Sequence, residues 1–149
     1  KLVNKYFDFA GKSVLKKKNE FIHPEEIIHH AFQYLNTPYL WGGKSILGID
    51  CSGFTQTIFK VNNFELPRDA YQQAELGQLV EFGNQRNADI AFFKNDNNKI
   101  THVGICLNNN EIIHCSGFVR VDKLTADGII SKDENMQTHN LAFMKRIGN

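Results

Sequence analysis

The hydrophobic pattern of the chain changes period near Gly77, and this change constrains the fold more than any other feature. Before Gly77, apolar residues recur at helical spacing in two stretches, which begin near Pro24 and Cys51. After it, short apolar runs alternate with turns rich in Asn, Gly and Asp. Helices followed by strands are typical of an α+β domain. We therefore expect N-terminal helices packed on a central antiparallel sheet of about five to six strands.

The expected helices have recognisable ends. Pro24 suits the first position of a helix, and Asn-Thr-Pro at 36–38 stops the apolar repeat that follows it. A second helix fits residues 51–61, with Asp50 as its candidate N-cap. A glycine-rich loop leads up to this cap. A short third helix fits residues 69–76.

Six segments after Gly77 have the composition of strands. They cover residues 79–82, 89–94, 100–107, 111–116, 118–122 and 141–147. The third and fourth segments flank three asparagines at 108–110, and Asn tolerates the left-handed backbone that a tight turn needs. A three-residue turn pairs Leu107 with Glu111 and so fixes the register of this hairpin.

That register places two histidines on one face of the hairpin. Gly104 then faces His114, and because side chains alternate along a strand, His102 shares the face of His114. The two histidines become diagonal neighbours whose rings can reach each other. A two-residue turn would place them on opposite faces, so the expected contact depends on the length of the turn. Two such histidines could serve structure, bind a metal or act in catalysis.

The chain has three cysteines, Cys51, Cys106 and Cys115, and an odd count leaves at least one thiol free. In the hairpin register Cys106 and Cys115 lie on opposite faces, which disfavours a disulfide between them. We expect both to be reduced and buried. No Cys-x-x-Cys pair is present, and we expect no metal or other cofactor. A zinc site formed by Cys51 and the two hairpin histidines stays open as an alternative.

Cys51 has the surroundings of a nucleophile. It sits at the N-terminus of an expected helix, and a helix N-terminus or a nearby imidazolium lowers the pKa of a thiol. One histidine placed against Cys51 could take its proton while the second orients the first. Asp50 works against this, because a carboxylate beside a thiol raises the pKa of the thiol. Either Asp50 caps the helix or its charge serves the substrate.

Length and composition fit one globular domain. The chain has 149 residues, of which 42% are hydrophobic, and this suffices for a packed core. A net charge of +1 gives no indication of a nucleic-acid partner. No apolar run approaches the roughly 18 residues of a transmembrane segment, and no signal peptide is visible. We expect residues 1–20 to be irregular, as a linker or the end of a missing upstream domain, and residues 21–149 to form the domain.

Four sequence blocks together resemble one known family. They are Tyr39-Leu40-Trp41-Gly42-Gly43, Asp50-Cys51-Ser52-Gly53-Phe54, Thr101-His102-Val103-Gly104-Ile105 and Ile112-Ile113-His114. In order and spacing they are similar to the NlpC/P60 family of cell-wall cysteine peptidases, from about His23 to the end of the chain. The chain departs from the family at Ala88-Asp89, where Gly-Asp is usual. Many relatives also carry an SH3-like domain upstream, for which residues 1–20 are too short.

The resemblance implies a fold, an activity and a set of catalytic residues. The family has a reduced papain-like fold, in which the cysteine helix packs against an antiparallel sheet bearing the histidines. Its members typically hydrolyse amide bonds in bacterial peptidoglycan stem peptides, often between D-γ-glutamate and a diamino acid such as meso-diaminopimelate. By resemblance Cys51 is the nucleophile, His102 the general base, His114 the residue that orients His102, and Tyr39 an oxyanion donor. The implied location is extracytoplasmic, in a bacterial envelope or secreted.

The resemblance also suggests substrate-binding residues. Asp50 and Ser52 match positions that in some members bind the free α-amine of an L-Ala-γ-D-Glu stem peptide, and Trp41 and Arg68 are further candidates. Each has a structural alternative: Asp50 and Ser52 as helix caps, Trp41 as a core aromatic and Arg68 as a salt-bridge partner. The remaining histidines match no motif and are expected to be solvated: His23, His29, His30 and His139.

Two other functions stay open. Relatives of this fold include N-acyl amidases and lipid acyltransferases, so the same chemistry could act on another acyl substrate. A non-catalytic module that binds the cell wall or a partner is a further alternative. Neither has a sequence feature of its own, because no amphipathic or lipid-anchoring segment is visible and every catalytic position is occupied.

Overall fold

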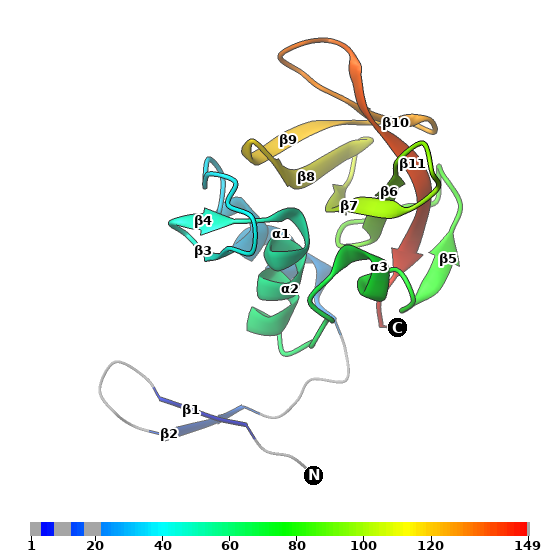
Figure 1. Ribbon diagram of the computed structural model, residues 1–149. Coiled ribbons are helices and arrows are strands. Elements are labelled where there is room, and N and C mark those ends of the chain that lie inside the picture. Colours follow the sequence, from blue (N-terminus) through cyan, green and yellow to red (C-terminus); the bar gives the residue numbers. More distant parts are fainter. Residues whose placement is uncertain (1–3, 8–12, 17–21, 149) are drawn as a thin grey trace.

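A computed structural model describes the chain from Ile22 to Gly148, together with the backbone of two short strands near the N-terminus (Figure 1). These strands, β1 (Asn4–Phe7) and β2 (Ser13–Lys16), pair antiparallel with each other. The expectation of an irregular segment is therefore wrong for these two stretches. The rest of that segment lies outside the described residues, and its role as a linker or the end of another domain stays a prediction.

Three helices precede the main sheet: α1 (Pro24–Phe32), α2 (Cys51–Val61) and α3 (Ala70–Gln73). α2 has the bounds that the sequence predicts. Its predicted cap is confirmed, because the Asp50 side chain accepts a hydrogen bond from the backbone N–H of Gly53. α3 is shorter than predicted, since the chain leaves the helix at Ala74 and turns through Gly77. Two short strands, β3 (Lys44–Ser45) and β4 (Gly48–Ile49), form a small hairpin within the loop before α2.

Seven strands form one antiparallel sheet in the order β10-β9-β8-β7-β6-β11-β5. Their bounds are β5 (Gln78–Val80), β6 (Ile90–Lys94), β7 (Ile100–Leu107), β8 (Glu111–Ser116), β9 (Phe118–Leu124), β10 (Gly128–Ile130) and β11 (Gln137–Arg146). β10 also pairs with β11, so six strands close into a barrel and β5 extends it at the far edge of β11. The expected α+β architecture is confirmed, with one strand more than expected.

The closure of the barrel involves the parts of the sheet that the sequence analysis missed. β10 is only three residues long, and β11 begins four residues before the predicted strand at 141. Both extra stretches pair with each other, through Gly128 with Asn140 and Ile129 with His139. The two stretches lie close together in the chain, but β10 is too short to show the alternation by which a strand is recognised.

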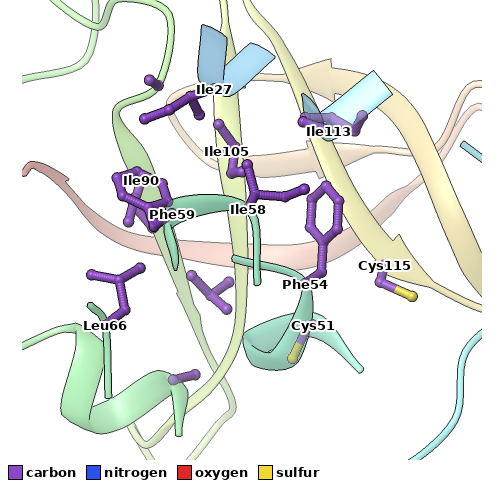
Figure 2. Close-up of a cluster of buried hydrophobic side chains, with 14 of the residues drawn as sticks. Ile27, Cys51, Phe54, Ile58, Phe59, Leu66, Ile90, Ile105, Ile113 and Cys115 are labelled. Atoms are coloured by element: carbon purple, nitrogen blue, oxygen red, sulfur yellow. The ribbon is translucent and has the colours of Figure 1, made fainter. Parts of the chain in front are cut away.

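The largest hydrophobic cluster lies between the helices and the sheet (Figure 2). α2 and α3 pack against β7, and α2 also contacts β8 (Figure 1). From α2, fully buried Phe54, Ile58 and Phe59 fill this layer. Cys51 and Cys115 belong to the same cluster, as Figure 2 shows. A second, smaller cluster occupies the opposite face of the sheet and includes Cys106. The packing therefore fixes the start of α2 against the strands that carry the histidines.

Candidate active site

Cys51 is the first residue of α2, and it is 8% exposed. The backbone N–H of Val103 lies near enough to the thiol to favour its ionised form. The thiol therefore lies beside the strand residue that follows His102. This agrees with the prediction that the helix N-terminus and the strand bearing His102 lie together.

The environment of Cys51 favours the neutral thiol. Burial raises the pKa of the Cys51 thiol, and the negative charge of Asp50 raises it further. The backbone N–H groups of Val103, Ser52 and Cys51 act in the opposite direction but do not reverse the shift. The position at a helix N-terminus therefore does not by itself produce a stable thiolate here. A base that removes the proton during the reaction is needed.

Asp50 and Arg68 form an ion pair next to Cys51. Arg68 Nη2 lies 2.5 Å from Asp50 Oδ2, and Arg68 Nη1 donates to Asp50 Oδ1 at 2.9 Å. Asp50 also accepts hydrogen bonds from the backbone N–H groups of Gly42 (2.8 Å) and Gly53 (2.7 Å). Burial alone would raise the pKa of this carboxyl, but these hydrogen bonds lower it below its ordinary value. Asp50 is thus a helix cap whose charge Arg68 offsets.

Ser52 joins this cluster through the same arginine. Arg68 Nη1 donates to Ser52 Oγ at 3.0 Å, and the Ser52 hydroxyl lies 3.4 Å from Asp50 Oδ1. The salt-bridge alternative for Arg68 is therefore confirmed, while its guanidinium remains partly exposed, at 29%. The three predicted substrate-binding residues Asp50, Ser52 and Arg68 thus form one hydrogen-bonded group beside the candidate nucleophile.

The predicted register of the histidine hairpin is confirmed in every pair. Leu107 pairs with Glu111, and Gly104 pairs with His114. His102 Nε2 lies 2.8 Å from His114 Nδ1, and the two rings are nearly perpendicular, at 85°. Both side chains are buried. Gly104 makes room for this contact, because a Cβ at this position would come within 2.8 Å of the His114 Cβ.

An aspartate on the next strand completes the buried polar chain. His114 Nε2 lies 3.0 Å from Asp122 Oδ2, and Arg120 Nε lies 2.7 Å from the same oxygen. Asp122 and Arg120 were not predicted from the sequence. A signal was available, because Asp122 is the diagonal neighbour of His114 once Ser116 pairs with Phe118 across a tight turn.

His139 is a correction to the expectation that the remaining histidines are solvated. Its ring stacks on the ring of His102, with the centroids 4.1 Å apart, and it also contacts Phe93 and His114. The pairing of β11 with β6, which itself pairs with β7, brings the start of β11 to this place, and the pairing of β11 with β6 was not predicted. His30 is also partly buried and bonds to the Asn62 side chain, whereas His23 and His29 are exposed as expected.

The loop before α2 carries the aromatic candidates. Trp41 is 86% exposed, so its alternative as a core aromatic is wrong. Tyr39 is 37% exposed, and its phenol has a raised pKa because of partial burial and of the negative charges that Cys51 and Asp50 can carry. Its hydroxyl therefore lies in the electrostatic field of the thiol. Gly53 lets α2 approach this loop, since a Cβ there would meet the carbonyl oxygen of Gly43 at 2.5 Å.

The described residues offer neither a metal site nor a helix that could cross a membrane. Between Ile22 and Gly148, no group of three or more His, Cys, Asp or Glu side chains has an arrangement that could hold a metal ion. Among the helices that the structure describes, none is both long and apolar enough to cross a membrane.

A buried cysteine at a helix N-terminus, packed against a sheet with a hydrogen-bonded histidine pair, is the side-chain set that cysteine peptidases use. The chain belongs to the NlpC/P60 family, whose sequence model matches residues 36–139. The predicted resemblance is confirmed.

Known relatives agree with this assignment. The γ-D-glutamyl-L-lysine dipeptidyl-peptidase of Bacillus subtilis is 41% identical over 92 residues, which cover 60% of this chain and 31% of the relative. The murein DD-endopeptidase MepS/murein LD-carboxypeptidase of Escherichia coli K12 is 38% identical over 98 residues, which cover 65% of this chain and 47% of the relative. A crystal structure of an NlpC/P60 family protein from Bacillus cereus superposes with a TM-score of 0.77 at 26% identity, covering 93% of this chain and 45% of that one. The chain thus spans less than half the length of these relatives.

Proposed function

We propose that this chain is the catalytic domain of a cysteine endopeptidase that hydrolyses peptidoglycan stem peptides. The observation that carries this proposal is the hydrogen bond of 2.8 Å between His102 and His114, on the strands that α2 and Cys51 pack against. A single buried thiol has structural explanations, but a thiol with a base and an orienting histidine has the parts of covalent catalysis.

The residues suggest the course of the reaction. His102 Nε2 is engaged with His114, so Nδ1 is the ring nitrogen left to take the proton of Cys51. The Cys51 sulfur then attacks the amide carbonyl carbon, and the carbonyl oxygen becomes an oxyanion. Collapse of this intermediate breaks the C–N bond, and His102 gives its proton to the leaving amine. Water, deprotonated by His102, then hydrolyses the thioester and restores the thiol.

The oxyanion needs donors that are fixed before the reaction begins. The backbone N–H of Cys51 is one such donor, because the first N–H groups of a helix have no partner within the helix. The Tyr39 hydroxyl is the proposed second donor, and its raised pKa keeps it protonated near neutral pH. Substrate therefore binds, in this proposal, along the loop that carries Tyr39 and the exposed ring of Trp41.

The proposed bond is the amide between D-γ-glutamate and a diamino acid such as meso-diaminopimelate, in the cell envelope or outside the cell. The name of the Bacillus subtilis relative gives a γ-D-glutamyl bond, which supports this choice. The name of the Escherichia coli relative instead specifies a DD-endopeptidase, so the DD bond of a peptide cross-link is the second candidate for the bond that is cleaved. Asp50 and Ser52 would contact a free substrate amine only through oxygens that already accept hydrogen bonds from Arg68.

Mass spectrometry of products from defined muropeptides tests the proposal. The substrates are L-Ala-γ-D-Glu-meso-diaminopimelate with a free or an acetylated N-terminus, a DD-cross-linked dimer, and an acyl-lipid. We expect cleavage after γ-D-Glu, and its loss in Cys51→Ala with an unchanged circular dichroism spectrum. Cys115→Ser is the matched thiol control and should remain active. Turnover by Cys51→Ala would overturn the mechanism, and activity on the lipid alone would overturn the substrate.

A further inference from the structure

Asp122 accepts hydrogen bonds on both carboxylate oxygens, and the two oxygens have different partners. Oδ1 lies 2.8 Å from the backbone nitrogen of Lys132 and 3.1 Å from Arg120 Nη2. Oδ2 lies 2.7 Å from Arg120 Nε and 3.0 Å from His114 Nε2. The side chain is 2% exposed. Within the described part of the chain, Arg120 Nε makes no hydrogen bond despite this short distance. The two fixed donors at Oδ1, the Lys132 backbone N–H and Arg120 Nη2, hold the carboxylate in one orientation.

This arrangement determines where the histidine protons lie. A buried carboxylate beside a guanidinium is ionised and can only accept, so His114 Nε2 must carry a hydrogen. A neutral His114 then has a lone pair on Nδ1, which faces His102 Nε2 at 2.8 Å. His102 must therefore donate from Nε2, and its Nδ1 is left without a hydrogen. The proton positions on two rings thus follow from one aspartate.

We propose that Asp122 is a positioning residue that sets the tautomers of His114 and His102, so that His102 Nδ1 is the free base. This inference rests on the proposed function, in which Nδ1 takes the proton from Cys51. Asp122 acts only through the two histidines and does not contact the substrate. Arg120 holds Asp122, and it is itself bound to Asp133 at 2.8 Å.

The substitution Asp122→Asn should move the hydrogen from Nε2 to Nδ1 on both histidine rings. Lys132 and Arg120 Nη2 both donate to Oδ1, whereas Arg120 Nε makes no hydrogen bond at Oδ2, so the amide oxygen takes the place of Oδ1 and the amide NH2 faces His114. His114 Nε2 must then accept, and its hydrogen moves to Nδ1. That hydrogen points at His102 Nε2, which must accept in turn. His102 is left with its hydrogen on Nδ1, where it cannot take a proton from Cys51.

The test combines tautomer measurement with kinetics at pH 7.5. Two-dimensional 15N NMR of the histidine rings should find wild-type His114 and His102 with hydrogen on Nε2 and both rings inverted in Asp122→Asn. Hydrolysis of the stem peptide by this variant should fall at least about a hundredfold in kcat. Asp133→Asn is the matched control, because Asp133 is exposed and contacts Arg120 but neither histidine. It should keep the wild-type tautomers and rate.

Each outcome is decisive. Hydrogen on Nδ1 of either ring in the wild-type protein overturns the inference, whether or not Asp122→Asn folds. Unchanged tautomers or a wild-type rate in a folded Asp122→Asn variant also overturn it. If the wild-type protein has the predicted tautomers and the variant inverts them, but no muropeptide is cleaved, the inference stands and the proposed function fails.

Discussion

The ring of His139 lies stacked on the ring of His102, with the planes 29° apart. His102 is buried and His139 is partly buried, and two imidazoles in such contact disfavour a positive charge on either. Burial lowers the pKa of His102 well below its usual range, and His114 and His139 lower it further. Burial also lowers the pKa of His139, to about 4, with a further contribution from His114 that Asp122 partly opposes. His139 therefore affects the base although it carries no predicted role.

The first prediction is that folding stability depends on this stack. Both histidines bind protons with a pKa near 6.5 in the unfolded chain but resist protonation when folded. The unfolded state thus binds more protons between about pH 6.5 and 4, so stability is full above pH 6.5 and is lost as the pH falls through this window. Urea unfolding at pH 7.5 and at pH 5.0 gives the loss in the free energy of unfolding between these two pH values. This loss should be about 1 kcal/mol smaller in His139→Gln than in the wild type, with allowance for the partial exposure of His139. Equal losses would contradict this prediction.

The second prediction concerns the ion pair of Arg68 and Asp50. Arg68→Ala leaves the Asp50 charge without its guanidinium partner beside Cys51, so the pKa of the thiol should rise. Alkylation by iodoacetamide at pH 8 should become several-fold slower, and stability should fall by about 2 kcal/mol. Arg86→Ala, at an exposed arginine, is the control and should change neither. Faster alkylation of Arg68→Ala would show that Asp50 does not raise the pKa of the thiol.

The third prediction tests the oxyanion donor. Tyr39→Phe removes one hydroxyl and keeps the ring, so kcat on the stem peptide should fall about a hundredfold with little change in KM. Tyr71→Phe, at an exposed tyrosine, should leave kcat unchanged. A Tyr39→Phe variant that loses affinity but keeps kcat would indicate that Tyr39 binds substrate and does not stabilise the oxyanion.

The fourth prediction follows from the contact between Gly104 and His114. An added Cβ in Gly104→Ala would come within 2.8 Å of the His114 Cβ and of the Ile112 Cδ1. His114 must then move away from His102, so kcat should fall at least tenfold and stability by about 1–3 kcal/mol. Gly104→Ala combined with Ile112→Val should recover part of the stability. It should recover little activity, because the clash with His114 remains; full recovery of both would argue against this explanation.

The features that the sequence predicted correctly are local ones. The bounds of α2 follow from an N-cap and a helical repeat, and both signals lie within a dozen residues. The register of β7 and β8 follows from three asparagines between two apolar runs. Because side chains alternate along strands, that register also predicted the contact of His102 with His114. The histidine pair of the candidate triad could therefore be predicted from two short stretches of sequence.

The features that the sequence missed depend on contacts between distant segments. His139 reaches His102 because β11 pairs with β6, and β6 in turn pairs with the strand of His102. Arg68 was predicted as a possible salt-bridge residue, but its partner Asp50 was not, because Asp50 lies 18 residues away. Asp122 was within reach of the same alternation rule, but that required the register of a second hairpin.

The number of residues in the turn between β7 and β8 determines on which face of the sheet His114 lies. Asn109 and Asn110 have positive φ angles, 66° and 57°, and no predicted role in the reaction. Other residues that tolerate this backbone could replace them, so their identity is open to drift. The number of residues in the turn is not, since one insertion or deletion would turn His114 to the opposite face of the sheet. Selection should therefore preserve the parity of this turn more strictly than its composition, and redesigns should alter its length two residues at a time.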